Sequence, residues 1–171
     1  MTAAESNVVR EVEWLRHQAH MANVVVRSNL AGLTHEDSLI QPEGGGNCLN
    51  WVVGHLLAIY HHALPLLGQA PVMSTDVLAR YDRGSAPIVD AAEARRLSEL
   101  MTAWEECSRR IDAGLAALSP ETLDAPAPRS PNNDPNETIG SLLSTISWHQ
   151  AYHAGQTGLL RRVAGHEGAI R

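Results

Sequence analysis

The sequence predicts an all-α protein: a four-helix bundle with a long crossover connection between the second and third helices. Apolar residues recur at steps of three and four in four segments, at about residues 5–31, 48–67, 91–118 and 137–164. No segment shows the alternation of apolar and polar residues that is typical of a half-buried strand. A chain of 171 residues has the size of one ordinary domain, so we expect residues 1–171 to form a single bundle.

The first two predicted helices have clear ends. The first should stop near Gly32, and the second should begin after the glycine run at 44–46, with Asn47 as its N-cap. Pro65 lacks a backbone N–H and should kink or end the second helix, and Gly68 should finish it. The apolar stripe of the first helix comprises Val8, Val12, Leu15, Ala19, Ala22 and Val26.

The third and fourth predicted helices follow side chains that are able to cap them. Asp90 and Asn136 precede these segments and are typical N-cap residues. Ser119-Pro120 should close the third helix, and Gly165 should end the fourth. The apolar stripe of the third helix comprises Leu97, Leu100, Trp104, Cys107, Ile111, Leu115 and Leu118.

Two of the connections are long. Residues 69–90 are numerous enough to carry the chain back along the bundle, which predicts that the second and third helices run parallel. Residues 121–135 are rich in Pro and Asn and predict a surface loop. Both connections are candidate lids over one end of the bundle.

The fourth helix carries two histidines in its predicted core-facing stripe. His149 and His153 are four residues apart, so both imidazoles project from the same helix face. Buried polar groups need a partner, and a divalent metal explains two imidazoles that converge on one spot. A pair of hydrogen-bonded core histidines is the alternative. The stripe comprises Ile139, Leu142, Ile146, His149, His153, Gln156, Leu160 and Val163.

His55 is the candidate third ligand. It lies in the middle of the second helix among apolar residues, whereas His61 points elsewhere. His62 shares the stripe of His55 but lies about two turns, roughly 10 Å, along the helix, which is too far for the same ion. Three imidazoles from two facing helices suit zinc, nickel or iron(II) and leave positions open for water or substrate.

Two familiar metal motifs do not fit this chain. The spacing of His149 and His153 is that of the HExxH zinc proteases, but Gln150 stands where their general-base glutamate would be. A di-iron bundle of the ferritin type requires glutamates on several helices, and the core stripes carry no such carboxylates. The pattern therefore predicts a mononuclear site with histidine ligands alone.

Composition narrows the class of protein. The formal net charge is −6 without a Lys/Arg cluster, which argues against a nucleic-acid surface. The most apolar region, residues 49–67, is interrupted by histidines and a proline, so we expect no membrane span. Cys48 and Cys107 are far apart and lack CxxC spacing, which indicates reduced, buried thiols. The N-terminal residues do not resemble a signal peptide, so we expect a cytoplasmic protein.

Three segments resemble the DinB superfamily. They are Asn47–Leu56 (NCLNWVVGHL), Arg80–Pro87 (RYDRGSAP) and Trp148–Gln156 (WHQAYHAGQ). The resemblance spans nearly the whole chain and implies a four-helix bundle, commonly a homodimer, with a divalent metal held by three histidines. Carried over position by position, these ligands are His55, His149 and His153.

The resemblance also implies a range of activities. Characterised relatives include transferases and isomerases that use low-molecular-weight thiols such as bacillithiol, mycothiol or glutathione. A small-molecule S-transferase is therefore the first expectation, because a cation with an open position lowers the pKa of a bound thiol. A metal-dependent hydrolase and a non-catalytic metal-binding stress-response protein are the alternatives. No carboxylate base is evident beside the ligands in the sequence, which weighs mildly against the hydrolase.

Several further residues are candidates for binding a substrate. Trp51 and Trp148 flank the ligands and would form an apolar wall, although simple core packing is the alternative for both. Gln156 follows the last ligand and is expected to face either the ligands or the substrate. Tyr152 should point away from the metal. Loop arginines that could pair with the carboxylates of a thiol cofactor are Arg80, Arg83 and Arg129.

Overall fold

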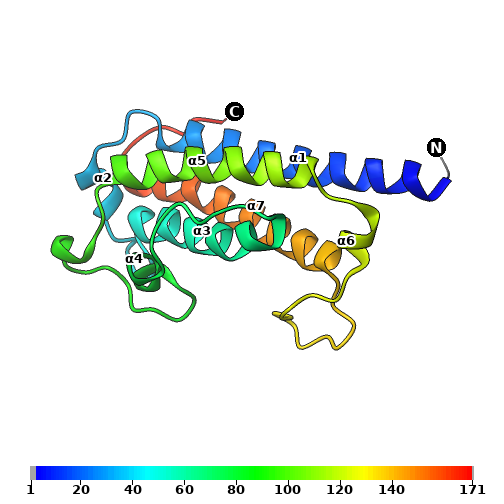
Figure 1. The fold of residues 1–171 in the computed structure, drawn as a ribbon. Coiled ribbons are helices and arrows are strands. Elements are labelled where there is room, and N and C mark those ends of the chain that lie inside the picture. Colours follow the sequence, from blue (N-terminus) through cyan, green and yellow to red (C-terminus); the bar gives the residue numbers. More distant parts are fainter. Residues whose placement is uncertain (1–2, 171) are drawn as a thin grey trace.

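The computed structural model describes residues 3–170, with side chains from residue 10 onward. Over this range the chain is all-α, and its only β-type pairing is one antiparallel bridge between Pro126 and Thr138. Four long helices form the bundle, α1 (Ala3–Leu30), α3 (Leu49–Ala63), α5 (Leu97–Ala116) and α7 (Ile139–Val163) (Figure 1). The predicted fold class is thereby confirmed.

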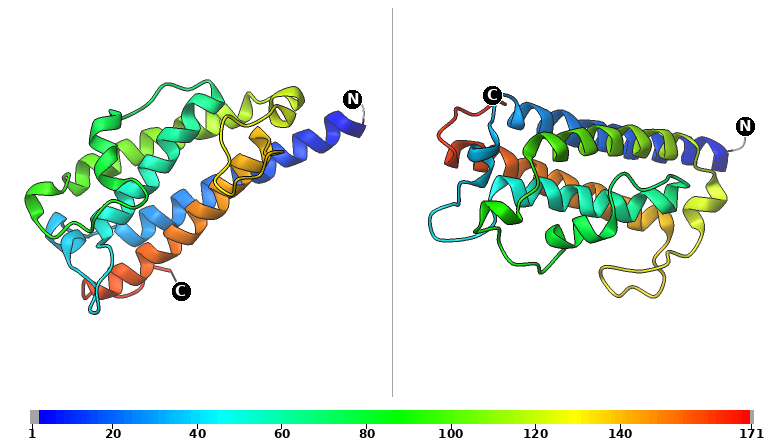
Figure 2. Two further views of the ribbon diagram at one scale, coloured as in Figure 1. Left: turned by 90° about the horizontal axis from the view of Figure 1, so that it is seen from below. Right: turned by 60° about the vertical axis from the view of Figure 1, so that its left-hand side comes forward.

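The crossover makes neighbouring helices parallel in pairs. Near the start of α3, Asn50 donates a hydrogen bond to the carbonyl of Arg95, which lies two residues before the start of α5. At the other end of α3, Leu67 lies against Gly114 near the end of α5. The two helices therefore run in the same direction, as predicted, and Figure 2 shows α1 and α7 running opposite to them. Around the bundle, α1 packs against α5 and α7, and α3 packs against the same two helices.

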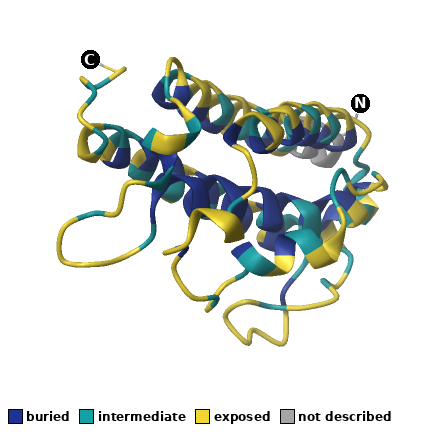
Figure 3. Cartoon of the chain, turned by 90° about the vertical axis from the view of Figure 1, so that its left-hand side faces the viewer, coloured by how far each residue is buried: buried dark blue, intermediate teal, exposed yellow. Residues whose placement is uncertain are grey.

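Helix α3 is covered on nearly all sides. Its residues from Leu49 to Ala58 are all buried, and Figure 3 shows buried residues concentrated where the long helices face one another. A helix that is apolar all round needs neighbours all round. The crossover supplies the fourth side, because Tyr81 and Ile88 are buried against the core. Gly54 permits this approach, since a Cβ at this position would collide with the Tyr81 ring.

The ends of the helices differ in part from the prediction. The third helix begins at Leu97, not near residue 91, because Asp90 caps only a single 3-10 turn, η3 (Ala91–Glu93), after which the chain becomes extended. The N-cap of α7 is Thr138, which forms a capping box with Ser141, and not Asn136. The N-cap of α3 is Cys48, not Asn47.

Short helices fill the connections. They are α2 (His35–Leu39), η1 (Leu64–Leu67), α4 (Thr75–Leu78), η2 (Ala79–Tyr81) and α6 (Pro120–Asp124). Pro65 and Gly68 act as predicted, because α3 tightens into η1 and ends at Gly68 with φ 66°. Ser119-Pro120, however, starts α6, since the Ser119 side chain accepts the N–H of Thr122. One or two turns give too little periodicity to be seen in a sequence.

The predicted core stripes are largely confirmed. In α1, Leu15, Ala22 and Val26 are buried, while Val12 and Ala19 are partly buried against them. Val8 lies outside the described side chains. All predicted apolar residues of α5 from Leu97 to Leu115 are buried, and both cysteines are free and buried. Among residues 3–170, no helix combines the length and apolarity needed to cross a bilayer.

Candidate metal centre

The structure brings three histidines together at the boundary between α3 and α7. One ring nitrogen from each of His55, His149 and His153 lies within 4.8 Å of the others. The Nε2 atoms of His55 and His149 are 3.2 Å apart. His55 and His149 lie on facing helices, and His153 follows one turn after His149, so the sequence spacing and the bundle together place the three rings.

Two of the imidazoles are held by hydrogen bonds to the nitrogen that faces away from the cluster. Nδ1 of His55 lies 2.8 Å from the carbonyl oxygen of Tyr81. Nδ1 of His153 lies 2.8 Å from Oε1 of Gln156. Because an oxygen of this kind only accepts, each Nδ1 carries the proton and each Nε2 keeps its lone pair. Nδ1 of His149 is buried without a partner among the described residues.

The arrangement fits a divalent cation. Ligands about 2.0–2.1 Å from zinc at a tetrahedral angle lie roughly 3.3 Å apart, close to the 3.2 Å between the two Nε2 atoms. Metal binding also requires neutral imidazoles. Burial is the main cause that lowers the pKa of all three histidines, and with the nearby charges of His153, His55 and Arg83 it lowers the pKa of His149 to about 4.

The crossover forms one wall of the site. Besides binding His55 through its carbonyl, Tyr81 uses its hydroxyl to donate to Asn50 and to accept the N–H of Arg95. Ser85 accepts the indole N–H of Trp51 at 2.9 Å. The Trp51 ring in turn stacks on His55, with centroids 4.7 Å apart. The sequence offered no signal for a backbone carbonyl, although Tyr81 and Ser85 lie in the Arg80–Pro87 segment.

Helix α7 is rotated relative to the predicted stripe. His149, His153 and Gln156 are half-buried at its flank toward α3, and Val163 at the end of the stripe is exposed. The fully buried polar residues are Gln150 and Thr157, which sequence analysis missed as core positions. Leu142, Ile146 and Leu160 are buried as predicted.

The two buried polar residues of α7 bind neighbouring helices. Gln150 donates to the carbonyl of Leu56 at 3.0 Å, which joins α7 to α3. Thr157 accepts from Asn29 at 2.9 Å, which joins α7 to α1. Their positions seven residues apart place them on one face, and this spacing is the signal that could have identified them. These bonds fix α7, and with it His149 and His153, against both neighbours.

The predicted substrate residues have different surroundings. Trp51 is buried against His55, whereas Trp148 is 67% exposed and stacks on the equally outward Tyr152. The two tryptophans therefore do not form one wall, and Trp148 is not a core residue. Tyr152 points outward as expected, with its ring also against the edge of His153. Gln156 was expected to face either the ligands or the substrate, and it binds the ligand His153.

The other histidines of α3 have separate partners. His62 faces Asp82 at 3.5 Å, and His61 faces the hydroxyl of Thr75 at 3.3 Å. Neither belongs to the three-histidine cluster, as predicted for His62. Asp82 was not anticipated as a neighbour of the site, but its negative charge acts to raise the pKa of His55 against the larger effect of burial. A carboxylate therefore stands near the ligands.

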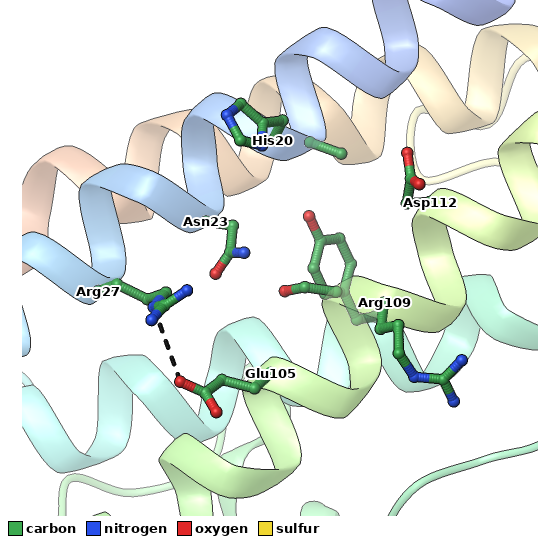
Figure 4. Close-up of a pocket in the computed structure, with 9 residues that line it drawn as sticks. His20, Asn23, Arg27, Glu105, Arg109 and Asp112 are labelled. Atoms are coloured by element: carbon green, nitrogen blue, oxygen red, sulfur yellow. Dashed lines mark ion pairs between the residues drawn. The ribbon is translucent and has the colours of Figure 1, made fainter.

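A cleft lies between α1 and α5, and none of the three clustered histidines lines it. Its volume is about 340 Å³, and it is lined mainly by charged and polar residues of α1 and α5, together with Tyr60 of α3 (Figure 4). The charged groups face partners of opposite sign, such as Arg27 and Glu105 at 3.6 Å. Asp112 binds Arg16 and Arg109 binds Glu106, each through two hydrogen bonds. This cleft contributes no group to the candidate metal centre.

Comparison with known proteins identifies the family. The family model of the DinB superfamily matches residues 18–157, a segment that contains all three histidines. A crystal structure of a conserved protein from Enterococcus faecalis has the same fold, with a TM-score of 0.68 and 16% sequence identity, over 89% of this chain and 95% of the other. A search of curated proteins found no match. The chain belongs to the DinB superfamily.

Proposed function

We propose that this protein is a divalent-metal-dependent S-transferase that joins a low-molecular-weight thiol to a small electrophile. The observation that carries the proposal is the convergence of three ring nitrogens within 4.8 Å, from His55, His149 and His153. Three histidine ligands leave at least one coordination position open for a small molecule, and this is the arrangement of catalytic zinc sites and not of structural ones. Structural zinc sites have four protein ligands, and no fourth candidate lies in the described cluster.

The donor set favours zinc, nickel or iron(II) over calcium or magnesium, which prefer oxygen ligands. When bound, such a cation lowers the pKa of a coordinated thiol and presents it as the thiolate at neutral pH. The protein's own part is to hold the imidazoles neutral and aligned. Burial lowers the pKa of each, and the hydrogen bonds to Tyr81 and Gln156 fix the orientation of His55 and His153.

We place the electrophile beside the stacked rings of Trp51 and His55, where the crossover forms the wall. Trp148 lies farther out, and we propose that it contacts only the outer part of a bound molecule, together with Tyr152. Gln156 supports this site through His153, and we propose that it also faces the substrate.

A metal-dependent hydrolase is the second candidate, and Asp82 is the observation that favours it. Its carboxylate lies close enough for its charge to act on His55, and it already pairs with His62. A carboxylate near a cation that activates water is a candidate general base. If the protein has neither activity, the third hypothesis remains, in which it is a non-catalytic metal-binding protein of the stress response.

Thermal melting distinguishes these functions. The metal-loaded protein is melted with bacillithiol, mycothiol or glutathione, and again after EDTA treatment. For an S-transferase, one thiol should raise the Tm only while the cation is present. A fall in Tm with EDTA but no response to any thiol would instead favour a structural or storage role. Zinc-dependent cleavage of model esters that is lost in Asp82→Asn would favour the hydrolase.

We further propose that the protein is a cytoplasmic homodimer. Helices α1 and α7 expose several large apolar side chains, which an interface with a second copy of the chain would cover. These residues are Trp14, Met21, Trp148, Tyr152 and Leu159. Light scattering should give a mass of about twice the 18.5 kDa of one chain, and the Leu159→Lys variant should shift it toward the monomer. A wild-type mass of one chain would exclude the dimer.

A further inference from the structure

Arg83 lies in the part of the crossover that is bound to the metal centre. It stands two residues after Tyr81, whose carbonyl binds His55, and two residues before Ser85, whose hydroxyl binds Trp51. Both flanking positions are therefore fixed to the cluster, which limits where the Arg83 backbone can be. The residue itself is exposed, and among the described residues it forms no hydrogen bond or ion pair.

Other charged groups of the same segment are already engaged. Arg80 donates to the carbonyls of Ala86 and Pro87 and pairs with Glu93. Asp82 pairs with His62. Arg83 is left as the one cation of the Arg80–Pro87 segment without a partner of opposite sign, although a guanidinium has five donors in a planar fork.

The charge of Arg83 acts on the histidines of the site. Behind burial and the neighbouring histidines, it is the smallest of the named causes that lower the pKa of His55 and of His149, whose rings come from different helices. Arg129, the other loop arginine considered above, affects none of the three histidines. A bound divalent cation would add further positive charge beside Arg83. Asp82, the carboxylate nearest in the chain, already pairs with His62, so a ligand that brings a negative charge of its own would best balance these two positive groups.

We propose that Arg83 forms an anion-binding subsite beside the three histidines, and that it holds a carboxylate of the thiol substrate. The inference rests on the proposed S-transferase function and narrows its substrate to thiols that carry a carboxylate. A planar guanidinium binds a carboxylate through two parallel hydrogen bonds, so the subsite would fix the thiol at a second point. Its sulfur would then be directed toward the open side of the histidine cluster.

Two simple thiols test this subsite. 3-Mercaptopropionate carries the carboxylate, and 3-mercaptopropionamide replaces it with a neutral group of similar shape. Each is titrated into cobalt(II)-loaded protein, and the thiolate-to-cobalt absorption band reports binding at the histidine site. In the wild type, we expect the carboxylate to bind about 10- to 100-fold more tightly than the amide.

The variants separate the role of Arg83 from general effects. In Arg83→Gln, the preference for the carboxylate thiol should fall to near the preference that aqueous cobalt(II) shows between the same two thiols. The affinity for the amide should stay unchanged. Arg129→Gln is the matched control, because it removes a loop arginine of equal charge outside the site, and it should keep the wild-type preference. Unchanged cobalt content and Tm in both variants verify that the fold and the cluster are intact.

The outcomes distinguish this inference from the function on which it rests. If both thiols produce the band and Arg83→Gln keeps the full preference, the subsite is excluded while thiol binding stands. If Arg83→Gln and Arg129→Gln lose the preference for the carboxylate thiol to the same extent, the preference arises from the net charge of the protein, and the subsite is also excluded. If neither thiol produces the band with cobalt bound, the S-transferase proposal fails and the inference fails with it.

Discussion

The backbone carbonyl of Tyr81 accepts a hydrogen bond from Nδ1 of His55 at 2.8 Å. This contact fixes the imidazole with its Nε2 lone pair toward His149 and His153, in the way that outer hydrogen bonds orient metal-binding histidines. It also makes the crossover a structural part of the candidate metal centre. The position of Tyr81 depends in turn on Gly54, where no side chain separates α3 from the tyrosine ring.

Gly54→Ala should therefore weaken both the fold and the metal site. The new methyl group would overlap the Tyr81 ring, and overpacking of this kind costs about 1–3 kcal/mol in the free energy of unfolding. Displacement of Tyr81 would remove the hydrogen bond to His55, so zinc affinity should fall as well. Urea denaturation and a zinc titration measure the two effects.

Gly155→Ala is the matched control for this substitution. Gly155 is also in a long helix, but a Cβ there meets nothing within 4 Å. Because alanine favours the helix, the variant should be more stable by about 0.5–1 kcal/mol and should keep its zinc affinity. Equal zinc affinities in both variants would contradict the role given to Tyr81.

Gln156→Leu should reduce metal affinity without unfolding the protein. Gln156 accepts the Nδ1 proton of His153 at 2.8 Å and lies at a half-buried position. Loss of such an outer partner typically lowers metal affinity about 10- to 100-fold. Competition with a zinc chelator measures the change, and Gln18→Leu on the exposed side of α1 serves as control. An unchanged dissociation constant would show that Gln156 does not support the ligand.

The metal-free protein should lose stability in mild acid. Burial first, and then neighbouring positive charges, lowers the pKa of His149 from 6.5 to about 4. Between these values the unfolded chain binds more protons than the native one, so the free energy of unfolding falls as the pH drops from 6.5 toward 4 and levels off below. Urea denaturation in EDTA at a series of pH values tests this.

The contribution of His149 is read from a variant. His149→Gln removes the titrating ring, so its stability should depend less steeply on pH than that of the wild type over the same range. Carboxylates whose pKa is lowered, such as Glu106, also destabilise the fold in acid, but they do so equally in both proteins. Identical slopes would mean that the ring of His149 is not buried in its neutral form.

The sequence predicts those features that depend on local spacing. The four-residue separation of His149 and His153 is sufficient to place two rings on one face, and Pro65 and Gly68 are sufficient to end α3. The predicted rotation of α7 is wrong, because the apolar pattern alone does not reveal that Gln150 and Thr157 form hydrogen bonds to Leu56 and Asn29 in other helices. Long-range partners of this kind are invisible to periodicity.

The start of α5 and the wall of the site show a second limit. Asp90 has the chemistry of an N-cap and does cap a turn, but the extended chain before Leu97 is set by packing of the crossover onto α3. Tyr81 acts on His55 through its backbone, which every residue type possesses. A role carried by the main chain leaves no trace in the identity of the residue.

Elemental analysis of the purified protein is the most direct test of the three-histidine metal site. The wild type is compared with His153→Ala and with His17→Ala, a control that removes an exposed histidine of α1. We expect about one divalent metal per chain in the wild type and the control, and its loss in His153→Ala. No metal in the wild type, and no uptake of added zinc or nickel, would show that the three histidines are core residues and do not form a metal site.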